Sequence, residues 1–358
     1  MRSFLLMLFL ALSVPSLQAQ IGGAAVYPFL QFSPSARISA LGGNLITVRD
    51  DDVNLAYANP ALLNSRMHHA LSFSHNLYLA GIQSGYVAYG HYLKKQDITL
   101  HGGVQYVSYG TFDATDEIGT VTGDFKAAEY AITLGAGKQL YERLAVGANL
   151  KFITSQLESY HSVGLAGDLG VTFIDTSRRF TASLVMRNIG GQLSAYRTGN
   201  REKIPYDLQV GLSHRLRYLP FRFSIIYHHL HRWNITYDDP NAVEPTLFLG
   251  EAPKESRFNM VVDNLFRHFI FSGEFLFGRN EPLRLRFGYN HLLRQELSVD
   301  NFRSLSGFTF GVGLKINRFR IDYGRGIYHL AGGINHFTLS TNLSEFSNKR
   351  LLDTGNPN

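Results

Sequence analysis

Apolar and polar side chains alternate with period two from about residue 68 almost to the end of the chain. In one such segment Ile98 and Leu100 share one face while Thr99 and His101 share the other. Fourteen segments of this kind can be counted, and most reach the roughly 9 to 11 residues that a tilted strand needs to cross a bilayer. The predicted strands cover residues 69–79, 81–93, 98–110, 125–140, 143–157, 159–174, 179–188, 205–217, 220–231, 264–278, 282–292, 306–317, 318–328 and 334–343.

Some of these strands carry arginines on one face and apolar residues on the other. An arginine at the bilayer midplane costs about 2 to 4 kcal/mol, so such a face must point into a lumen. A soluble β-sandwich also alternates, but its strands are usually shorter and its outer face is the polar one. The predicted lumen-facing residues are Arg284, Arg286, Arg318 and Arg320.

The connections between the predicted strands are short at one end and long at the other. The short turns lie near residues 94–97, 141–142, 175–178, 218–219, 279–281 and 317–318. The long connections lie near residues 111–124, 189–204, 232–263, 293–305 and 329–333. This regular phase is typical of outer-membrane barrels and predicts a fourteen-stranded antiparallel transmembrane β-barrel, with the long connections outside.

The segment before the strands has turn chemistry instead of alternation. Residues 20–67 are therefore predicted to form a plug, or hatch, inside the barrel. For its three consecutive aspartates, helix capping or ion pairs with luminal arginines such as Arg284 and Arg286 are favoured over calcium binding, because consecutive positions do not define a calcium geometry. The residues that mark this hatch are Gly42, Gly43, Asp50, Asp51, Asp52, Asn59 and Pro60.

The first residues are predicted to form a secretory signal peptide. Arg2 precedes an apolar run over residues 4–14, and cleavage is expected after Ala19. The expected organisation is a signal peptide over 1–19, the hatch over 20–67, the barrel over 68–343 and a tail over 344–358. The chain contains no cysteine, so packing and backbone pairing must hold it together.

Composition agrees with a membrane barrel and argues against nucleic-acid binding. Charged residues make up 17% of the chain, below the roughly 25% of soluble domains, whereas the chain has 34 glycines and 13% aromatic residues. The net charge is +6, from 34 Lys and Arg and 28 Asp and Glu, and the basic residues form no block.

The sequence shows no motif for catalysis or for a cofactor. It has no GxSxG elbow, Walker loop or HExxH pair, so a non-enzymatic protein without catalytic or cofactor-binding residues is expected. The nearest approach to a metal cluster is His228, His229 and His231. On a continuing strand His229 and His231 would share a face and His228 would point away, so no metal site is predicted.

The candidate partner-binding residues lie in the long connections. Aromatic residues on a long outer connection often supply most of an interface's binding energy, but the same rings can instead fold back over the barrel mouth. Both readings remain open for these residues. The candidates are Trp233, Tyr237, Phe248 and Phe258, together with the arginines Arg197 and Arg201.

Three stretches carry a resemblance to a known family: SARISALGG at 35–43, GVQYVSYG at 103–110 and NLKFITSQLESY at 149–160. With these, the chain resembles the PorQ-like barrels of the type IX secretion system, which group with PorV and the FadL-like barrels. The resemblance implies fourteen strands, an N-terminal hatch and a position in the outer membrane, in contact with lipid and lipopolysaccharide. It also implies a non-enzymatic role: anchoring a PorZ-like surface protein beside PorU and PorV, where PorU joins secreted cargo to anionic lipopolysaccharide.

The relation to FadL-like barrels leaves a second function open. A transporter of long-chain hydrophobic or amphipathic molecules would need an apolar pocket behind the hatch, whereas an anchor needs a sealed lumen and an adhesive outer rim. Inward-facing arginines argue against a purely apolar pocket. They would still pair with the acidic head of an amphipathic ligand.

Overall fold

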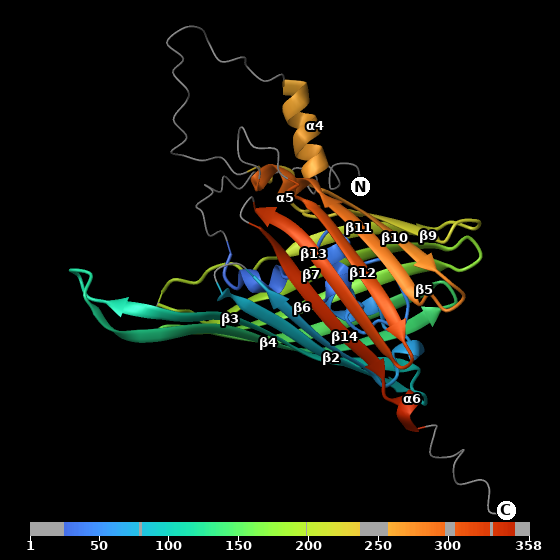
Figure 1. The fold of residues 1–358 in the computed structure, drawn as a ribbon, viewed down its shortest axis with the longest axis horizontal. Helices are drawn as coiled ribbons and strands as arrows, with labels where there is room; N and C mark the ends of the chain where they lie inside the picture. Colours follow the sequence, from blue (N-terminus) through green and yellow to red (C-terminus); the bar gives the residue numbers. More distant parts are fainter. Residues whose placement is uncertain are drawn as a thin grey trace, which may run out of the picture.

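The alternating segments form fourteen antiparallel strands that close into one barrel, as predicted (Figure 1). The structure is a computed structural model that describes residues 25–78, 81–197, 199–236, 257–297, 305–329 and 332–347. The expected signal peptide and most of the expected tail lie outside these residues. The strands are β1 (Ala70–Leu77), β2 (Gln83–Leu93), β3 (Ile98–Thr115), β4 (Val121–Tyr141), β5 (Leu144–Leu157), β6 (Tyr160–Asp175), β7 (Phe180–Ser194), β8 (Asp207–Arg215), β9 (Phe221–Tyr227), β10 (Phe269–Phe277), β11 (Leu283–Asn290), β12 (Phe308–Ile316), β13 (Phe319–His329) and β14 (Gly332–Asn342).

The barrel wall has its apolar face outside and its polar face inside. On β5, Leu150 and Phe152 are 54% and 46% exposed, whereas their neighbours Asn149 and Lys151 are buried toward the lumen. Outward-facing apolar side chains recur on strands all around the barrel. This inverted polarity is that of a membrane-spanning barrel of the outer-membrane type.

Every connection at one end of the barrel is short, as predicted, and this end also carries the end of β14. The opposite end, which we call the outer end, carries the helices α4 (Arg257–Arg267) and α5 (His291–Glu296). Among the described residues, no helix has the length and hydropathy required to span a membrane.

One predicted outer loop is mostly strand. Residues 111–124 were expected to form a loop, but β3 and β4 continue through them and leave only residues 116–120 as the connection. Cross-strand pairs extend the ladder, and the rings of Phe112 and Phe125 stack with centroids 5.4 Å apart. The hairpin consequently projects far beyond the rest of the barrel (Figure 1).

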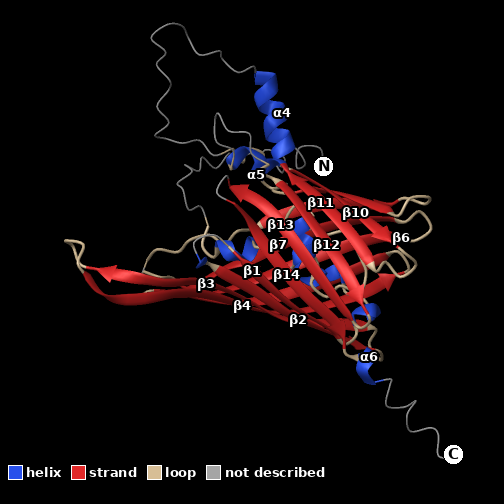
Figure 2. Cartoon of the chain, in the orientation of Figure 1, coloured by secondary structure: helices blue, strands red, loops and turns tan. Residues whose placement is uncertain are grey.

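The hatch consists of short helical turns enclosed by the strands (Figure 2). They are η1 (Pro28–Gln31), α2 (Ala36–Ala40), α3 (Leu55–Ala58), η2 (Pro60–Leu62) and η3 (Ser65–Met67). N-cap side chains accept a backbone hydrogen bond at the start of three of these turns: Ser35 Oγ from Ile38, Asn59 Oδ1 from Ala61 and Asn64 Oδ1 from Arg66. Most hatch side chains are buried, so the molecule's core lies between the hatch and the inner wall.

Glycines on the inner wall let the hatch backbone approach closely. Gly137, Gly147 and Gly170 are register partners on β4, β5 and β6, and together they seat the Asn59-Pro60 turn. A Cβ atom on Gly147 would lie only 2.3 Å from the carbonyl carbon of Pro60. Any side chain there must therefore displace the hatch or the strand.

We predict that Gly147→Ala weakens the seating of the hatch, because overpacking a close contact typically costs about 1 to 3 kcal/mol. The variant should unfold at a lower temperature than the wild type in a heat-modifiable gel assay. Gly191→Ala on β7 is the matched control, since a Cβ atom there would meet nothing within 4 Å. Equal unfolding temperatures for the two variants would contradict the close contact.

Candidate functional site

Arg37 holds the hatch in the lumen. It lies on α2, and its side chain is completely buried. Its guanidinium is 2.6 Å from Asp50 Oδ2 and 3.2 Å from Asp52 Oδ2, farther along the hatch. It is also 3.2 Å from Glu274 Oε1 on β10. A guanidinium offers five donors in a fixed plane, so this one residue joins two parts of the hatch to the wall.

Glu274 extends the ion pairs across the wall. Besides Arg37, it pairs with Arg222 on β9 and with Arg286 on β11, whose Nε is 2.9 Å from Glu274 Oε1. Arg286 in turn places its Nη1 2.5 Å from Asp322 Oδ1 on β13. The same inner surface, from β9 to β13, therefore supplies charges of both signs.

The three consecutive aspartates of the hatch face this surface. Asp50 Oδ2 lies 3.9 Å from Arg284 Nη1, and Asp51 Oδ1 lies 3.2 Å from Arg320 Nη1. Burial alone would raise the pKa of Asp50. The positive charge of Arg37, and to a lesser extent those of Arg284 and Arg222, lowers that pKa well below its ordinary value. Asp50 is therefore ionised at neutral pH, and its charge contributes to the seal.

Opposite charges balance in this network, which we call the hatch lock. It has five cations and five anions, so its formal charge is zero. Buried charges are tolerated when each has a partner, and the removal of one partner is then costly. The members are Arg37, Arg222, Arg284, Arg286 and Arg320, and Asp50, Asp51, Asp52, Glu274 and Asp322.

Arg318, which was predicted to face the lumen, lies at the rim of the barrel and lines a pocket there together with Asp51 and Arg320. It lies in the turn between β12 and β13, just beyond the alternating run, so the inside-outside rule does not apply to it. Its guanidinium carbon lies 4.8 Å from the centre of the Phe346 ring in α6 (Ser344–Ser347), at the rim of the barrel.

A second polar cluster lies on the other side of the lumen, under the ring of Tyr57. Lys151 is fully buried, with its Nζ 2.8 Å from Asp168 Oδ2 and 4.6 Å from the ring centre. The hydroxyl of Tyr57 lies 2.9 Å from the carbonyl oxygen of Leu30 and 2.6 Å from Gln105 Oε1. This cluster ties α3 of the hatch to β3, β5 and β6.

These strong contacts include residues that the sequence analysis did not single out. Arg37, Lys151, Asp168 and Glu274 all escaped notice. Lys151, Asp168 and Glu274 could have been found in the sequence, because each is a charged residue at an inward position of a predicted strand. Their partners could not be assigned, because they come from distant parts of the chain.

The other marker residues of the hatch serve close packing. Asn59 Nδ2 donates to the carbonyl oxygen of Ile46 at 2.8 Å and to Thr172 Oγ1 at 3.0 Å. Gly42 and Gly43 have φ values of 87° and 89°, a region that favours glycine, and Gly42 N donates to Thr309 Oγ1 at 2.9 Å. Pro60 begins η2, where a missing N–H costs nothing.

An apolar cleft of about 580 Å³ opens at the outer end, between the first hatch residues and the wall. Aromatic side chains supply much of its lining, and three carboxylates reach it. The residues that matter most for its chemistry are Tyr27, Tyr109, Phe112, Phe125, Tyr160 and Tyr196, with Glu129, Glu158 and Glu202.

Four of the six predicted partner-binding residues lie within the described part of the chain. Arg197 and Arg201 are exposed between β7 and β8, and Arg197 lies over the Tyr160 ring at 5.4 Å. Trp233 is half exposed and stacks near His268, while Phe258 on α4 is 74% exposed. Tyr237 and Phe248 lie outside the described residues.

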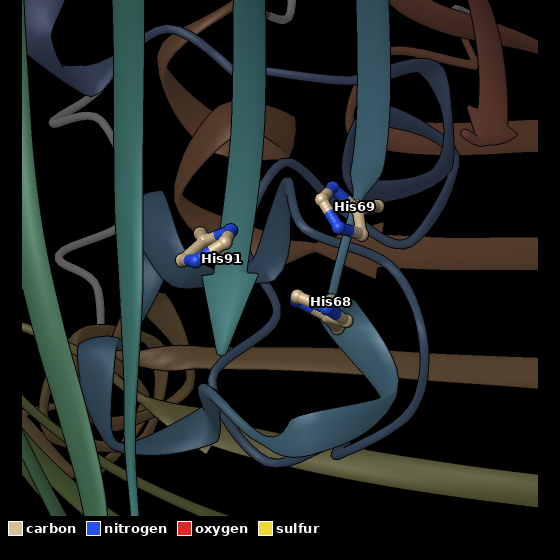
Figure 3. Close-up of side chains that lie close together, drawn as sticks. All are labelled: His68, His69 and His91. Atoms are coloured by element: carbon tan, nitrogen blue, oxygen red, sulfur yellow. The ribbon is translucent and has the colours of Figure 1, made fainter. Parts of the chain in front are cut away.

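Two groups of side chains have the spacing of metal ligands. Figure 3 shows the first, in which His68 and His69 at the end of the hatch approach His91 on β2. The backbone N–H of Tyr92 donates to His68 Nδ1 at 3.1 Å, and His69 Nδ1 lies 2.8 Å from the Tyr89 hydroxyl. The second group, at the outer end, is Asp207, His228 and His229.

No protein-family model and no curated protein matches the chain. Among solved structures, a deltaS2 mutant of the TodX monoaromatic hydrocarbon channel is similar over 87% of this chain and 97% of its own, with 13% identity and a TM-score of 0.49. The CymD monoaromatic hydrocarbon channel is similar over 86% and 96%, with 13% identity and a TM-score of 0.47. A Pseudomonas aeruginosa FadL homologue is similar over 86% and 98%, with 8% identity and a TM-score of 0.47.

We predict that Arg37→Met opens the hatch. The change leaves Asp50, Asp52 and Glu274 without their shared cation, and a broken buried ion pair typically costs about 3 to 5 kcal/mol. Purified variant in planar bilayers should show ion conductance that the wild type lacks, and trypsin should cut the hatch at Arg49. Arg318→Met, at the rim, should behave as wild type. A sealed, protease-resistant Arg37→Met barrel would refute the role of the hatch lock.

Proposed function

We propose that this outer-membrane barrel binds and passes small apolar or amphipathic molecules, with the hatch as its gate. The observation that carries the proposal is the aromatic cleft at the outer end. Its volume of about 580 Å³ lies within the range of about 300 to 1,000 Å³ that is usual for small-molecule sites. Aromatic walls with a few polar groups are also usual for such sites.

The charges in the cleft narrow the class of ligand. Glu129, Glu158 and Glu202 line it, and no lysine or arginine is among the described lining residues. Glu129 also accepts a hydrogen bond of 2.6 Å from the Tyr109 hydroxyl. Carboxylates repel a fatty acid's head, so the cleft favours uncharged molecules or amphiphiles with a cationic head.

The cleft ends on the part of the hatch that ion pairs do not hold. Tyr27 lines the cleft and also belongs to an apolar cluster with Phe29 and Leu30 of the hatch and with Val107 and Ile153 of the wall. A ligand in the cleft therefore touches the hatch directly. Displacement of these first hatch residues would extend the cleft into the lumen.

We predict saturable binding of dodecylamine and dodecanol, and much weaker binding of dodecanoate, to the barrel in lipid nanodiscs. The double variant Phe125→Ala, Tyr160→Ala should bind dodecylamine at least about tenfold more weakly, which corresponds to about 1.4 kcal/mol. Equilibrium dialysis with labelled compounds measures both effects. Phe346→Ala, which removes an exposed ring at the opposite end, is the control. Binding no greater than to empty nanodiscs, or equal in the double variant, would exclude the cleft as a ligand site.

A second candidate function is the docking of a surface protein, and exposed apolar residues on α4 favour it. Phe258, Met260, Val261 and Phe266 are 74%, 48%, 54% and 44% exposed on this helix, which stands above the barrel in Figure 1. The helix is fixed at its base, because Asp263 lies 2.9 Å from His291 Nε2 of α5. Large exposed apolar side chains on a fixed helix are suited to binding a partner.

The resemblance to PorQ-like barrels gives this candidate a partner. In that case the barrel would hold a PorZ-like surface protein in the type IX attachment complex, indirectly beside PorU and PorV. The hatch lock also suits an anchor, since an anchor needs no open lumen. The two candidate functions use different parts of the outer end, so separate variants can test them.

For the docking function we predict that Phe258→Ser with Val261→Ser releases a surface protein from the barrel. Native purification from outer membranes, followed by mass spectrometry, should show a stoichiometric partner with the wild type and at least about tenfold less with the variant. Phe125→Ala with Tyr160→Ala is the control, because it alters the cleft and leaves α4 unchanged. A barrel without a stoichiometric partner, or a partner retained by the α4 variant, would exclude docking on this helix.

A further inference from the structure

Asp207, His228 and His229 meet at the outer end, where β8 begins and β9 ends. The two strands are antiparallel neighbours, so the first residue of β8 lies beside the residues that follow β9. Backbone bonds fix this junction: Leu230 N donates to the carbonyl oxygen of Leu208 at 2.9 Å. One possible ligand atom from each of the three side chains lies within 4.8 Å of the other two.

The sequence pattern predicted a different arrangement for these histidines, and that prediction is wrong. It placed His228 and His229 on opposite faces of a continuing strand. The strand ends at Tyr227, and His229 has a φ of 56°, so the chain turns and the alternation stops. The Nδ1 atoms of His228 and His229 consequently lie directly against each other.

Asp207 is a buried carboxylate without a full counter-charge. It is 7% exposed, and within the described ranges no lysine or arginine pairs with it. Its register partner Arg187 instead places its guanidinium carbon 5.6 Å from the centre of the Tyr57 ring. Asp207 Oδ1 accepts from the backbone N–H of His229 at 2.7 Å, and Oδ2 accepts from Gln209 Nε2 at 2.6 Å. Buried carboxylates are usually paired with a cation or bound to a metal.

The two imidazoles have lone pairs to offer. The Nδ1 atoms of His228 and His229 lie directly against each other, so they cannot both carry a proton. A cation bound by both rings would use the lone pair of each, and its charge would offset that of Asp207.

We propose that Asp207, His228 and His229 bind a divalent transition-metal ion of the zinc class. Two imidazoles and one carboxylate are a common ligand set for zinc, and water or a further side chain completes the coordination. His231 is a candidate for that position, since its ring centre lies 6.0 Å from that of His229. The ion would join the start of β8 to the base of the connection that leads to α4.

The histidine group of Figure 3 provides the matched control. His68, His69 and His91 are only half buried, and no carboxylate belongs to the group. The Nδ1 atom of His68 accepts a hydrogen bond from the N–H of Tyr92, so the proton of this ring is on Nε2. Metal binding through Nε2 would move that proton to Nδ1 and break the hydrogen bond. The group lies at the opposite end of the barrel, so substitution there leaves the proposed site unchanged.

The test is a zinc titration of the full-length mature barrel in detergent, purified through a tag that contains no histidine. Calorimetry should show one site of micromolar or tighter affinity. Residues that only hydrogen-bond to a zinc ligand already contribute about 10- to 100-fold to zinc affinity. Loss of a ligand itself, in His229→Ala or in Asp207→Asn, should therefore weaken zinc binding by at least about 100-fold. His91→Ala should bind as the wild type does.

Two controls separate loss of the site from loss of the fold. Heat-modifiable gel migration reports whether each variant forms the barrel, and the absorption spectrum of bound cobalt reports nitrogen and oxygen ligation in the wild type. Folded His229→Ala that binds zinc like the wild type would overturn the proposal. So would a wild-type barrel that binds no zinc, or binding that only His91→Ala abolishes.

Discussion

The structure depends on the cost of burying charge. Arg37 and Glu274 have almost no contact with solvent, and charges buried in this way are tolerated only when they are paired. The carboxylates of the hatch lock therefore position its arginines. One of these, Arg37, belongs to the hatch, and the other four lie on β9, β11 and β13 of the wall. Because one partner comes from the hatch and another from the wall, the hatch can take only one position in which every charge is paired. Closely packed glycines such as Gly147 and Gly324 then admit the hatch backbone at that position.

The same constraint divides the hatch into two parts. The part near β9 to β13 is held by ion pairs, while the part near β3 to β6 is held by apolar packing around Tyr27 and Leu30 and by the hydrogen bonds of the Tyr57 hydroxyl. The apolar cleft lies over the second part. The outer end thus offers three separate features: an apolar cleft, a helix with exposed apolar side chains and a junction rich in histidine.

The sequence was sufficient for the strands but not for their long-range partners. Period-two alternation is a local property, so it located fourteen strands and the inward faces of Arg284 and Arg286. The rule failed where strands end: Arg318 lies in a turn, and His229 follows a strand that is shorter than expected. It also underestimated the β3–β4 hairpin, whose cross-strand pairs continue through the predicted loop at 111–124. The contact between Arg37 and Glu274 joins residues 237 positions apart, and no local pattern encodes it.

The two-part hatch indicates how a gate could open at the lowest cost. Removal of the whole hatch would break the ion pairs that join Arg37, Asp50 and Asp51 to the wall, and each broken buried pair costs several kcal/mol. Movement of residues 26–30 alone would leave those pairs intact. It would expose apolar surface, at about 25 cal/mol for each Å², and would break hydrogen bonds such as that from the Tyr57 hydroxyl to the carbonyl oxygen of Leu30. A ligand in the cleft could offset that cost by covering the same apolar surface. The ion-paired part would then act as a fixed wall, and the apolar part would be the moving element. A ligand can shift the equilibrium between the closed and open hatch only by its difference in affinity for these two states. Tyr27 lines the cleft and belongs to the apolar part of the hatch, so its movement would change the affinity for the ligand.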